Sequence, residues 1–232
     1  MKMPVKEQQL LHCSIFEPLR PQTREHLAQI VDEVVFEAGE VLYTQDDPPV
    51  GLYYLLEGYV ILYRQSSEKS QILSLVQAGD CFGGESIANS KPSPYTAKVI
   101  AKTSIFYITP ENLQNLIQDY PDFLSLFLTI VTQRLRQLTT VVHDLAFRDV
   151  AARVASVLLM LVEAGGQPYA DGIHVPRVLS QQELAATVGT AREVVYRTLK
   201  QFEQQQILQK TSKQYIILDL EKLSEIASKE VD

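Results

Sequence analysis

Short apolar runs alternate with short polar turns between residues 34 and 108. The runs are rich in Val, Ile, Leu and Tyr, and segments such as EAGE, QDDPP, SSEK and QAGD separate them. Strands of this length at nearly regular spacing are typical of an all-β roll or barrel. Glycines at positions 39, 51, 58, 79 and 84 fall where a roll must turn corners, because glycine tolerates positive φ and close backbone approach. We therefore expect an all-β roll or barrel over these residues.

A long helical pattern follows. Residues 122–146 include neither Pro nor Gly. Apolar residues recur there at alternating spacings of four and three, which makes an a/d seam over about two heptads: Val131, Leu135, Leu138, Val142 and Leu145. Polar residues surround this stripe, including Arg134, so it favours a parallel dimer over packing within one chain. Nearer the start, packing on the helix's own domain is expected for Phe123, Leu124, Phe127 and Leu128.

Two short helices are predicted next, after an apolar-faced helix over residues 150–164. Ser180 is a good N-cap, and Glu183 three residues later completes a capping box. Gly189 provides a tight turn, and Thr190 is expected to cap the second helix over residues 191–204. This pattern is typical of a helix-turn-helix, whose second helix enters the DNA major groove. A hairpin with its turn at residues 211–213 would form a wing.

The free face of the second helix is polar and amphipathic. Arginine can bond guanine O6 and N7 together, and glutamate can accept from cytosine N4. A solvated charged face is the plainer interpretation. We assign the contacts with double-stranded DNA to nine residues: Ser180, Gln181, Thr190, Arg192, Glu193, Tyr196, Arg197, Lys200 and Lys213.

The distribution of charge favours this assignment. The 232-residue chain has a formal charge of −7, which by itself argues against nucleic acid. Residues 177–215, however, hold six basic and three acidic residues, a local charge of +3 that leaves −10 for the rest. A basic element within an acidic chain is expected of a modular DNA binder.

Other composition features narrow the class of protein. Two cysteines cannot supply the four thiolates of an iron–sulfur cluster, and their spacing fits no zinc pattern, so we expect neither. No segment approaches the ~20 apolar residues of a membrane span, and the N-terminus lacks the apolar core of a signal peptide. The sequence therefore predicts a cytoplasmic protein with reduced cysteines and no membrane partner.

Enzymes offer the main competing class. A cupin on such a roll needs clustered histidine and carboxylate ligands, but no histidine lies between His26 and His143. No nucleophile–base pair, P-loop or dinucleotide-binding glycine motif occurs either. We expect no enzymatic activity.

Five segments together resemble the cyclic-AMP receptor protein/FNR superfamily of bacterial regulators, over residues 16–223. They are LYYLLEGYV, GDCFGGE at residues 79–85, DLAFRDVAAR at residues 144–153, LSQQELA at residues 179–185 and VGTAREVVYR at residues 188–197. The resemblance implies an α+β fold in three parts. These are a cyclic-nucleotide-binding-like β-roll sensor, that is, a double-stranded β-helix (residues 1–120), a dimerisation helix (121–147) and a winged helix-turn-helix (148–232).

The resemblance also implies a DNA site. Arg192, Glu193 and Arg197 resemble the base-reading trio of the cyclic-AMP receptor branch, which implies an inverted repeat similar to TGTGA-N6-TCACA. Tyr196 stands where that branch usually has a small residue, so the central base preference stays open. Contact with RNA polymerase is a further implication.

The effector is harder to assign. The resemblance implies a pocket of Gly84, Glu85, Ser86, Tyr95 and Thr96, with Thr139 from the long helix. Relatives that bind cyclic AMP hold its phosphate with an arginine ten residues after the glutamate, and Tyr95 occupies that position here. Cyclic AMP is therefore disfavoured, and another ligand, no ligand, or a haem on Cys81 or Tyr95 stays open. The alternative function is a nucleotide-binding module acting on a protein partner, which would not need residues 150–232.

Overall fold

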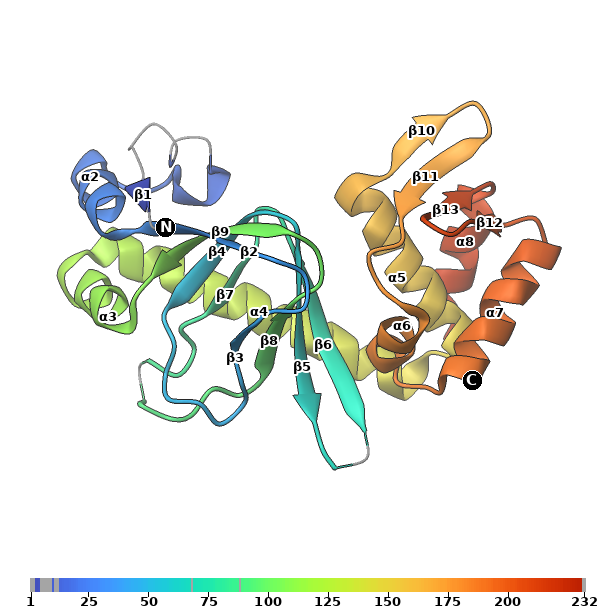
Figure 1. The fold of residues 1–232 in the computed structure, drawn as a ribbon, viewed down its shortest axis with the longest axis horizontal. Coiled ribbons are helices and arrows are strands. Elements are labelled where there is room, and N and C mark those ends of the chain that lie inside the picture. The colour runs from blue at the N-terminus through green and yellow to red at the C-terminus, as the bar shows by residue number, and fades with distance from the viewer. Residues whose placement is uncertain (1–2, 5–9, 11–12, 68, 88, 231–232) are drawn as a thin grey trace. The chain divides into compact units, whose positions relative to one another are not determined.

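The structure is a computed structural model that describes all residues except 1–2, 5–9, 11–12, 68, 88 and 231–232 (Figure 1). The start of the expected sensor domain thus lies partly outside the described residues. Contacts divide the chain into two compact units. The first comprises Met1–Ser67 and Leu73–Leu138, and the second Glu68–Ile72 and Thr139–Asp232. Helices and sheets are mixed as the sequence predicts, with a β-roll followed by a long helix and a helix-turn-helix.

Two antiparallel sheets form the β-roll (Figure 1). The first has the order β1 (Met3–Pro4), β2 (Asp32–Phe36), β9 (Thr103–Ile108), β4 (Leu52–Glu57) and β7 (Cys81–Gly83). The second has the order β3 (Val41–Tyr43), β8 (Thr96–Val99), β5 (Tyr59–Gln65) and β6 (Ser70–Gln77). The predicted strands and the predicted β-roll are confirmed.

The first sheet is covered on both faces, and its strands show this in their side-chain alternation. Along β4, Tyr53 and Leu55 belong to the core inside the roll, whereas Leu52 and Tyr54 belong to a second core. Successive side chains of a strand point to opposite faces, so an unbroken apolar strand needs a partner on each side. The N-terminal helices and the helices after β9 supply that second partner.

Short helices flank the roll: a 3₁₀ turn at Ser14–Phe16, α2 (Pro21–Ile30) and α3 (Pro110–Asp119). α3 begins with Pro at its first position, and Thr109 caps it by accepting from the backbone N–H of Asn112. The Thr23 hydroxyl donates to Asp122 at 2.8 Å, which joins α2 to the start of the next helix.

The long helix α4 (Pro121–Phe147) has two apolar stripes offset by one residue. Phe123, Phe127 and Ile130 are buried in the core between the first sheet and the helices that cover it, as expected for the first two. Leu124 and Leu128 do not join them and are exposed, so that part of the prediction is wrong. One position corresponds to about 100° around a helix, which is enough to turn the neighbouring leucines outward.

Arg134 also departs from expectation. It continues the inner stripe and is buried, although the sequence suggests a polar surface position. Its guanidinium donates to the Gln137 side chain at 2.9 Å and lies 3.5 Å from the carbonyl oxygen of Cys81. A buried arginine thus braces α4 against β7 inside the first unit.

Besides the end of the long helix and the start of β6, the described residues of the second unit form four helices and a four-stranded sheet (Figure 1). The helices are α5 (Val150–Gly165), α6 (Gln181–Val188), α7 (Arg192–Gln204) and α8 (Leu220–Ala227). The strands, in sheet order, are β10 (Gln167–Tyr169), β11 (Gly172–Pro176), β13 (Gln214–Ile217) and β12 (Leu208–Lys210). α5 is the central helix, because α6, α7, α8 and β11 all contact it. In the part of the chain that is described, no helix is long and apolar enough to cross a bilayer.

Candidate functional site

α6 and α7 form a helix-turn-helix whose local signals are all in the sequence. Ser180 Oγ accepts from the backbone N–H of Glu183 at 3.2 Å, and the Glu183 carboxylate accepts from the N–H of Ser180 at 2.8 Å. The predicted capping box is thereby confirmed. Gly189 ends α6 with φ +66°, a left-handed conformation that favours glycine. The turn therefore fixes where α7 begins.

Thr190 does not cap α7, contrary to the prediction. The N-cap is Ala191, which makes no side-chain cap hydrogen bond. The N–H groups of Gly189 and Thr190 both donate to the carbonyl oxygen of Ala185, so Thr190 closes the preceding helix instead. α7 consequently starts at Arg192, one residue later than expected.

One face of α7 is buried and the other is exposed. Val195, Thr198, Leu199 and Phe202 are buried against the rest of the unit. The exposed face carries the predicted contacts at Arg192, Glu193, Tyr196, Arg197 and Lys200. These five follow helical spacings of three and four, so α7 presents them together. Elsewhere in the unit, Ser180 and Lys213 are also exposed, whereas Gln181 and Thr190 are half-buried.

The wing is the hairpin of β12 and β13, and an arginine that sequence reasoning did not single out braces it. Arg177 Nη1 donates to the carbonyl oxygens of Thr211 and Ser212, at 2.9 and 3.2 Å. Its guanidinium also lies 5.5 Å from the centre of the Tyr215 ring. Arg177 contributed to the local positive charge, but these contacts make it a positioning residue. Its partners are more than thirty residues away, so no local pattern could reveal them.

A second brace joins the wing to α7. The backbone N–H of Lys210 donates to the Glu203 carboxylate at 3.1 Å. The Lys210 ammonium then lies 5.6 Å from the centre of the Tyr196 ring, within the range of a cation–π contact. Residues 177–215 contain three acidic residues, and the carboxylates of two of them, Glu183 and Glu203, accept hydrogen bonds from backbone N–H groups. The third, Glu193, lies on the exposed face of α7.

The connection between α4 and α5 is short and held by two arginines. Asp149 caps α5, accepting from the N–H of Ala152 at 2.7 Å. Arg148 is paired with Asp144 at 3.2 Å and donates to Ser156 Oγ at 2.9 Å. Arg153 donates back to the carbonyl oxygen of Arg148 at 2.7 Å. This network over the DLAFRDVAAR segment defines the path of the chain between the two helices.

The predicted effector pocket is occupied by its own side chains. Tyr95 is 4% exposed, and its hydroxyl donates to the Glu85 carboxylate. Burial, and then the nearby carboxylate, raise the pKa of the Tyr95 phenol, so it remains a proton donor. The two residues that would hold the phosphate and the ribose of a cyclic nucleotide therefore satisfy each other.

The rest of the predicted pocket is similarly engaged. Gly84 has φ +79°, and a Cβ there would lie 2.9 Å from Leu113. The Ser86 hydroxyl donates to the carbonyl oxygen of Pro92 at 3.0 Å, and Thr96 Oγ1 accepts from the N–H of Gln45 at 2.9 Å. Thr139 is exposed on the stretch of α4 that groups with the second unit, so its pocket role stays a prediction.

Aromatic rings fill the roll around Tyr95. Ring centres are separated by 6.0 Å for Tyr43 and Tyr95, 5.7 Å for Tyr43 and Tyr53, and 5.0 Å for Tyr53 and Phe82. A fourth pair joins Tyr53 to Tyr107 at 4.6 Å. Among the described residues, no group of three or more His, Cys, Asp or Glu could hold a metal ion. Around Tyr95, the described part of the roll is thus a packed aromatic core that the Glu85 carboxylate contacts.

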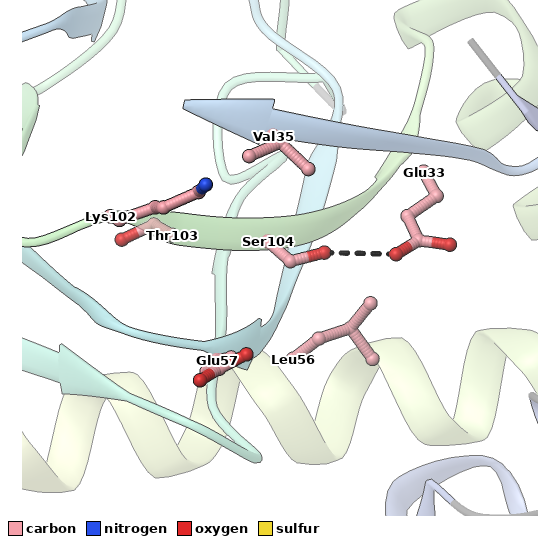
Figure 2. A pocket seen from close by; sticks show the side chains of 7 residues that line it. All are labelled: Glu33, Val35, Leu56, Glu57, Lys102, Thr103 and Ser104. Atoms are coloured by element: carbon pink, nitrogen blue, oxygen red, sulfur yellow. Dashed lines mark hydrogen bonds between the residues drawn. The ribbon is translucent and has the colours of Figure 1, made fainter. Parts of the chain in front are cut away.

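A separate pocket of about 390 Å³ lies on the outer side of the first sheet (Figure 2). Figure 2 shows Ser104 directed at Glu33, to which its hydroxyl donates at 3.0 Å. Lys102 is the one cation among the seven lining residues, and its ammonium lies 3.8 Å from Glu37. With carboxylates at Glu33 and Glu57, this pocket does not suit an anion such as a nucleotide phosphate.

Known proteins match both units. The cyclic nucleotide-binding domain family matches residues 33–120, and the Crp-like helix-turn-helix domain family matches residues 152–226. A CRP-like cAMP-activated global transcriptional regulator of Mycobacterium tuberculosis is 28% identical over 93% of this chain and 96% of its own. The cAMP-activated global transcriptional regulator CRP of Salmonella typhimurium is 31% identical over 78% of this chain and 87% of its own.

A solved structure shares the fold. FixK2 from Bradyrhizobium japonicum superposes with a TM-score of 0.76 at 22% identity, covering 87% of this chain and all of its own. The two matched domains follow one another in the same order as the roll and the helix-turn-helix described above. Together with the identity to the Salmonella regulator, these matches show that the chain belongs to the Crp/Fnr family of DNA-binding transcription regulators.

Proposed function

We propose that this protein is a homodimer that binds an inverted-repeat DNA site with its two copies of α7. The exposed face of α7 is the observation that supports this most directly, because arginines, a lysine, a glutamate and a tyrosine share it while the opposite face is buried. Residues 1–120, 121–147 and 148–232 would then serve as sensor, dimerisation helix and DNA-binding domain. A regulator of this kind needs no catalytic residue, and it acts where the DNA is, in the cytoplasm.

The exposed stripe of α4 supports dimerisation. Leu128, Leu135 and Val142 are 57%, 63% and 66% exposed, and Leu124 and Leu145 are exposed as well. With Val131 and Leu138 these residues repeat at alternating spacings of four and three over three heptads, which is longer than the seam expected from the sequence. A second copy of the same stripe is the natural partner, since a/d seams pack knobs into holes. A two-fold axis along α4 also matches the symmetry of an inverted repeat.

The DNA site would resemble TGTGA-N6-TCACA. Arg192, Glu193 and Arg197 lie within the first two turns of α7, the region from which a recognition helix reaches base edges. Half-sites about one helical turn apart, ~34 Å, would let both protomers bind the same face of B-DNA. RNA polymerase is the expected protein partner at such a site.

Selection from random duplexes is the direct test of this function. The full-length protein should enrich a palindromic motif with guanines in each half-site, and binding should weaken steeply as salt rises. A protein that enriched no motif would instead fit the second candidate, a nucleotide-binding module acting on a protein partner. The basic face of α7 favours the first candidate, because such a module has no need for it.

The two relatives described above are named as cAMP-activated regulators, but we do not expect cyclic AMP to activate this protein. Glu85 already accepts a hydrogen bond from Tyr95, and the segment of residues 84–96 contains no arginine that could bind the phosphate. We expect the roll to respond to a different effector, or to hold one state without any. A signal there would shift the population of two arrangements of the Asp144–Arg148–Arg153 connection and so re-aim α7.

Substituting Tyr95→Arg tests this explanation. The substitution frees Glu85 and supplies a guanidinium, and a charge-assisted bond is worth ~1.5–3 kcal/mol, so cyclic AMP should bind about ten- to a hundred-fold more tightly than to the wild type. Isothermal calorimetry would measure the two affinities. Tyr95→Phe is the matched control, because it frees Glu85 without adding a cation and should gain no affinity. Equal affinity of wild type and Tyr95→Arg would show that Tyr95 does not exclude the nucleotide.

A further inference from the structure

Tyr196 is an unusual feature of the exposed α7 face. It is 50% exposed, it is the one aromatic residue among the nine predicted contacts, and it lies one turn after Arg192 and one turn before Lys200. Residues four apart on a helix are neighbours, so the ring is flanked by cations along its stripe. A half-exposed aromatic ring at this place meets whatever α7 binds.

The wing holds the ring in position. Lys210 approaches the ring from β12, with its ammonium 5.6 Å from the ring centre, and its own backbone is fixed by the hydrogen bond to Glu203 on α7. The turn that follows β12 is braced by Arg177. Because the lysine backbone is anchored to the same helix as the ring, the two side chains form one element from α7 and the wing. Lys210 is a positioning residue in this element.

The apolar character of the Tyr196 ring indicates which DNA base it would contact. The major groove edge of thymine carries a C5-methyl group, and apolar side chains recognise thymine by contact with it. Cytosine, adenine and guanine offer only polar groups or ring atoms at the corresponding edge. An aromatic ring with cations on either side therefore fits a thymine methyl between two phosphate or guanine contacts.

We propose that Tyr196, positioned by Lys210, reads the C5-methyl group of one thymine in each half-site. This inference rests on the proposed function, since it requires α7 to lie in a major groove. It adds a base preference that the Arg192, Glu193 and Arg197 trio does not supply. Hydrogen bonding by the phenol hydroxyl and a contact with a phosphate are the competing roles, and neither depends on the methyl group.

Uracil in place of thymine tests the inference, because it removes the methyl group and leaves every hydrogen-bonding group. Duplexes carrying the motif selected by the wild type would be made with uracil at one thymine at a time, and affinities measured by fluorescence anisotropy. At one position per half-site the wild type should lose about four-fold in affinity, the amount expected for one methyl group buried against a ring. Tyr196→Ala should bind the thymine and uracil duplexes equally, whereas Tyr196→Phe should keep the discrimination.

Three control variants separate positioning from charge and from folding. Lys210→Ala should reduce both the affinity and the thymine-to-uracil ratio, because the ring is no longer held. Lys213→Ala removes a cation from the same wing, so it should lower the affinity for DNA. The slope of log affinity against log salt concentration should become shallower by ~0.9 per lost phosphate contact. The thymine-to-uracil affinity ratio should not change. Tyr169→Ala removes an exposed tyrosine from the β10–β11 hairpin, outside the helix-turn-helix, and should leave both affinity and ratio unchanged.

The outcomes distinguish this inference from the proposed function. If selection enriches a palindrome but the thymine-to-uracil ratio is the same for wild type and Tyr196→Ala, the inference is wrong and the DNA-binding function stands. If the wild type binds the thymine and uracil duplexes equally while Tyr196→Phe binds both more weakly, the hydroxyl group makes the contact and the methyl contact is refuted. If selection enriches no motif, the proposed function itself fails.

Discussion

Replacing Leu135 by aspartate is expected to turn the dimer into monomers and to lower affinity for the inverted repeat by about 10²–10⁴-fold. In the proposed seam, Leu135 of each protomer faces the same residue of its partner, so the substitution buries two carboxylates without counter-charges. The monomer would bind each half-site separately and lose the gain from linking two binding modules, which is the source of the estimate. Sedimentation velocity gives the mass, and anisotropy with the palindromic duplex gives the affinity.

Leu220→Asp provides the matched control. Leu220 is an exposed leucine outside the seam, at the first position of α8, where an acidic residue is favourable. This variant should remain dimeric with unchanged affinity. Leu128→Asp and Val142→Asp should behave like Leu135→Asp if the seam extends over the full exposed stripe. A Leu135→Asp protein that sediments as a dimer and binds normally would refute dimerisation through α4.

Replacing Arg197 by alanine should lower affinity for the selected site at least about 30-fold. A bidentate arginine–guanine contact contributes ~1–3 kcal/mol to discrimination, and a symmetric dimer makes it twice. The loss should be concentrated at one base pair: the wild type should discriminate strongly against a guanine-to-adenine change there, and Arg197→Ala should be indifferent to it. Binding curves against a set of singly substituted duplexes would give both quantities.

Arg197→Lys distinguishes the two roles that Arg197 could have. Lysine keeps the charge and loses the planar fork, so a base-reading contact should be lost almost as completely as in the alanine variant. A phosphate contact would instead be largely retained by lysine, and its removal in Arg197→Ala would weaken all duplexes equally. A uniform loss across sequences would thus remove Arg197 from the base-reading trio.

The sequence by itself determined the elements whose signals are local. The capping box of Ser180 and Glu183 and the left-handed turn at Gly189 each depend on residues at most four positions apart. The strand alternation of the roll and the unbroken helix over α4 are periodic patterns of the same short range. These signals fixed the order of the parts, and with them the resemblance to the family.

Contacts between residues distant in the chain were decided only by the tertiary structure. Leu124 and Leu128 have the same apolar character as Phe123 and Phe127, and only the position of the roll makes one pair exposed and the other buried. Periodicity shows that a helix has an apolar face, but it does not show what covers that face.

The same limit applied at both candidate sites. The sequence placed Tyr95 where an arginine was expected, but it did not show that the phenol would satisfy Glu85. It placed Tyr196 on the exposed face of α7, but not beneath Lys210. Hydrogen bonds and ring contacts of this kind depend on where strands and helices meet in space, and neither helical nor strand periodicity encodes that meeting.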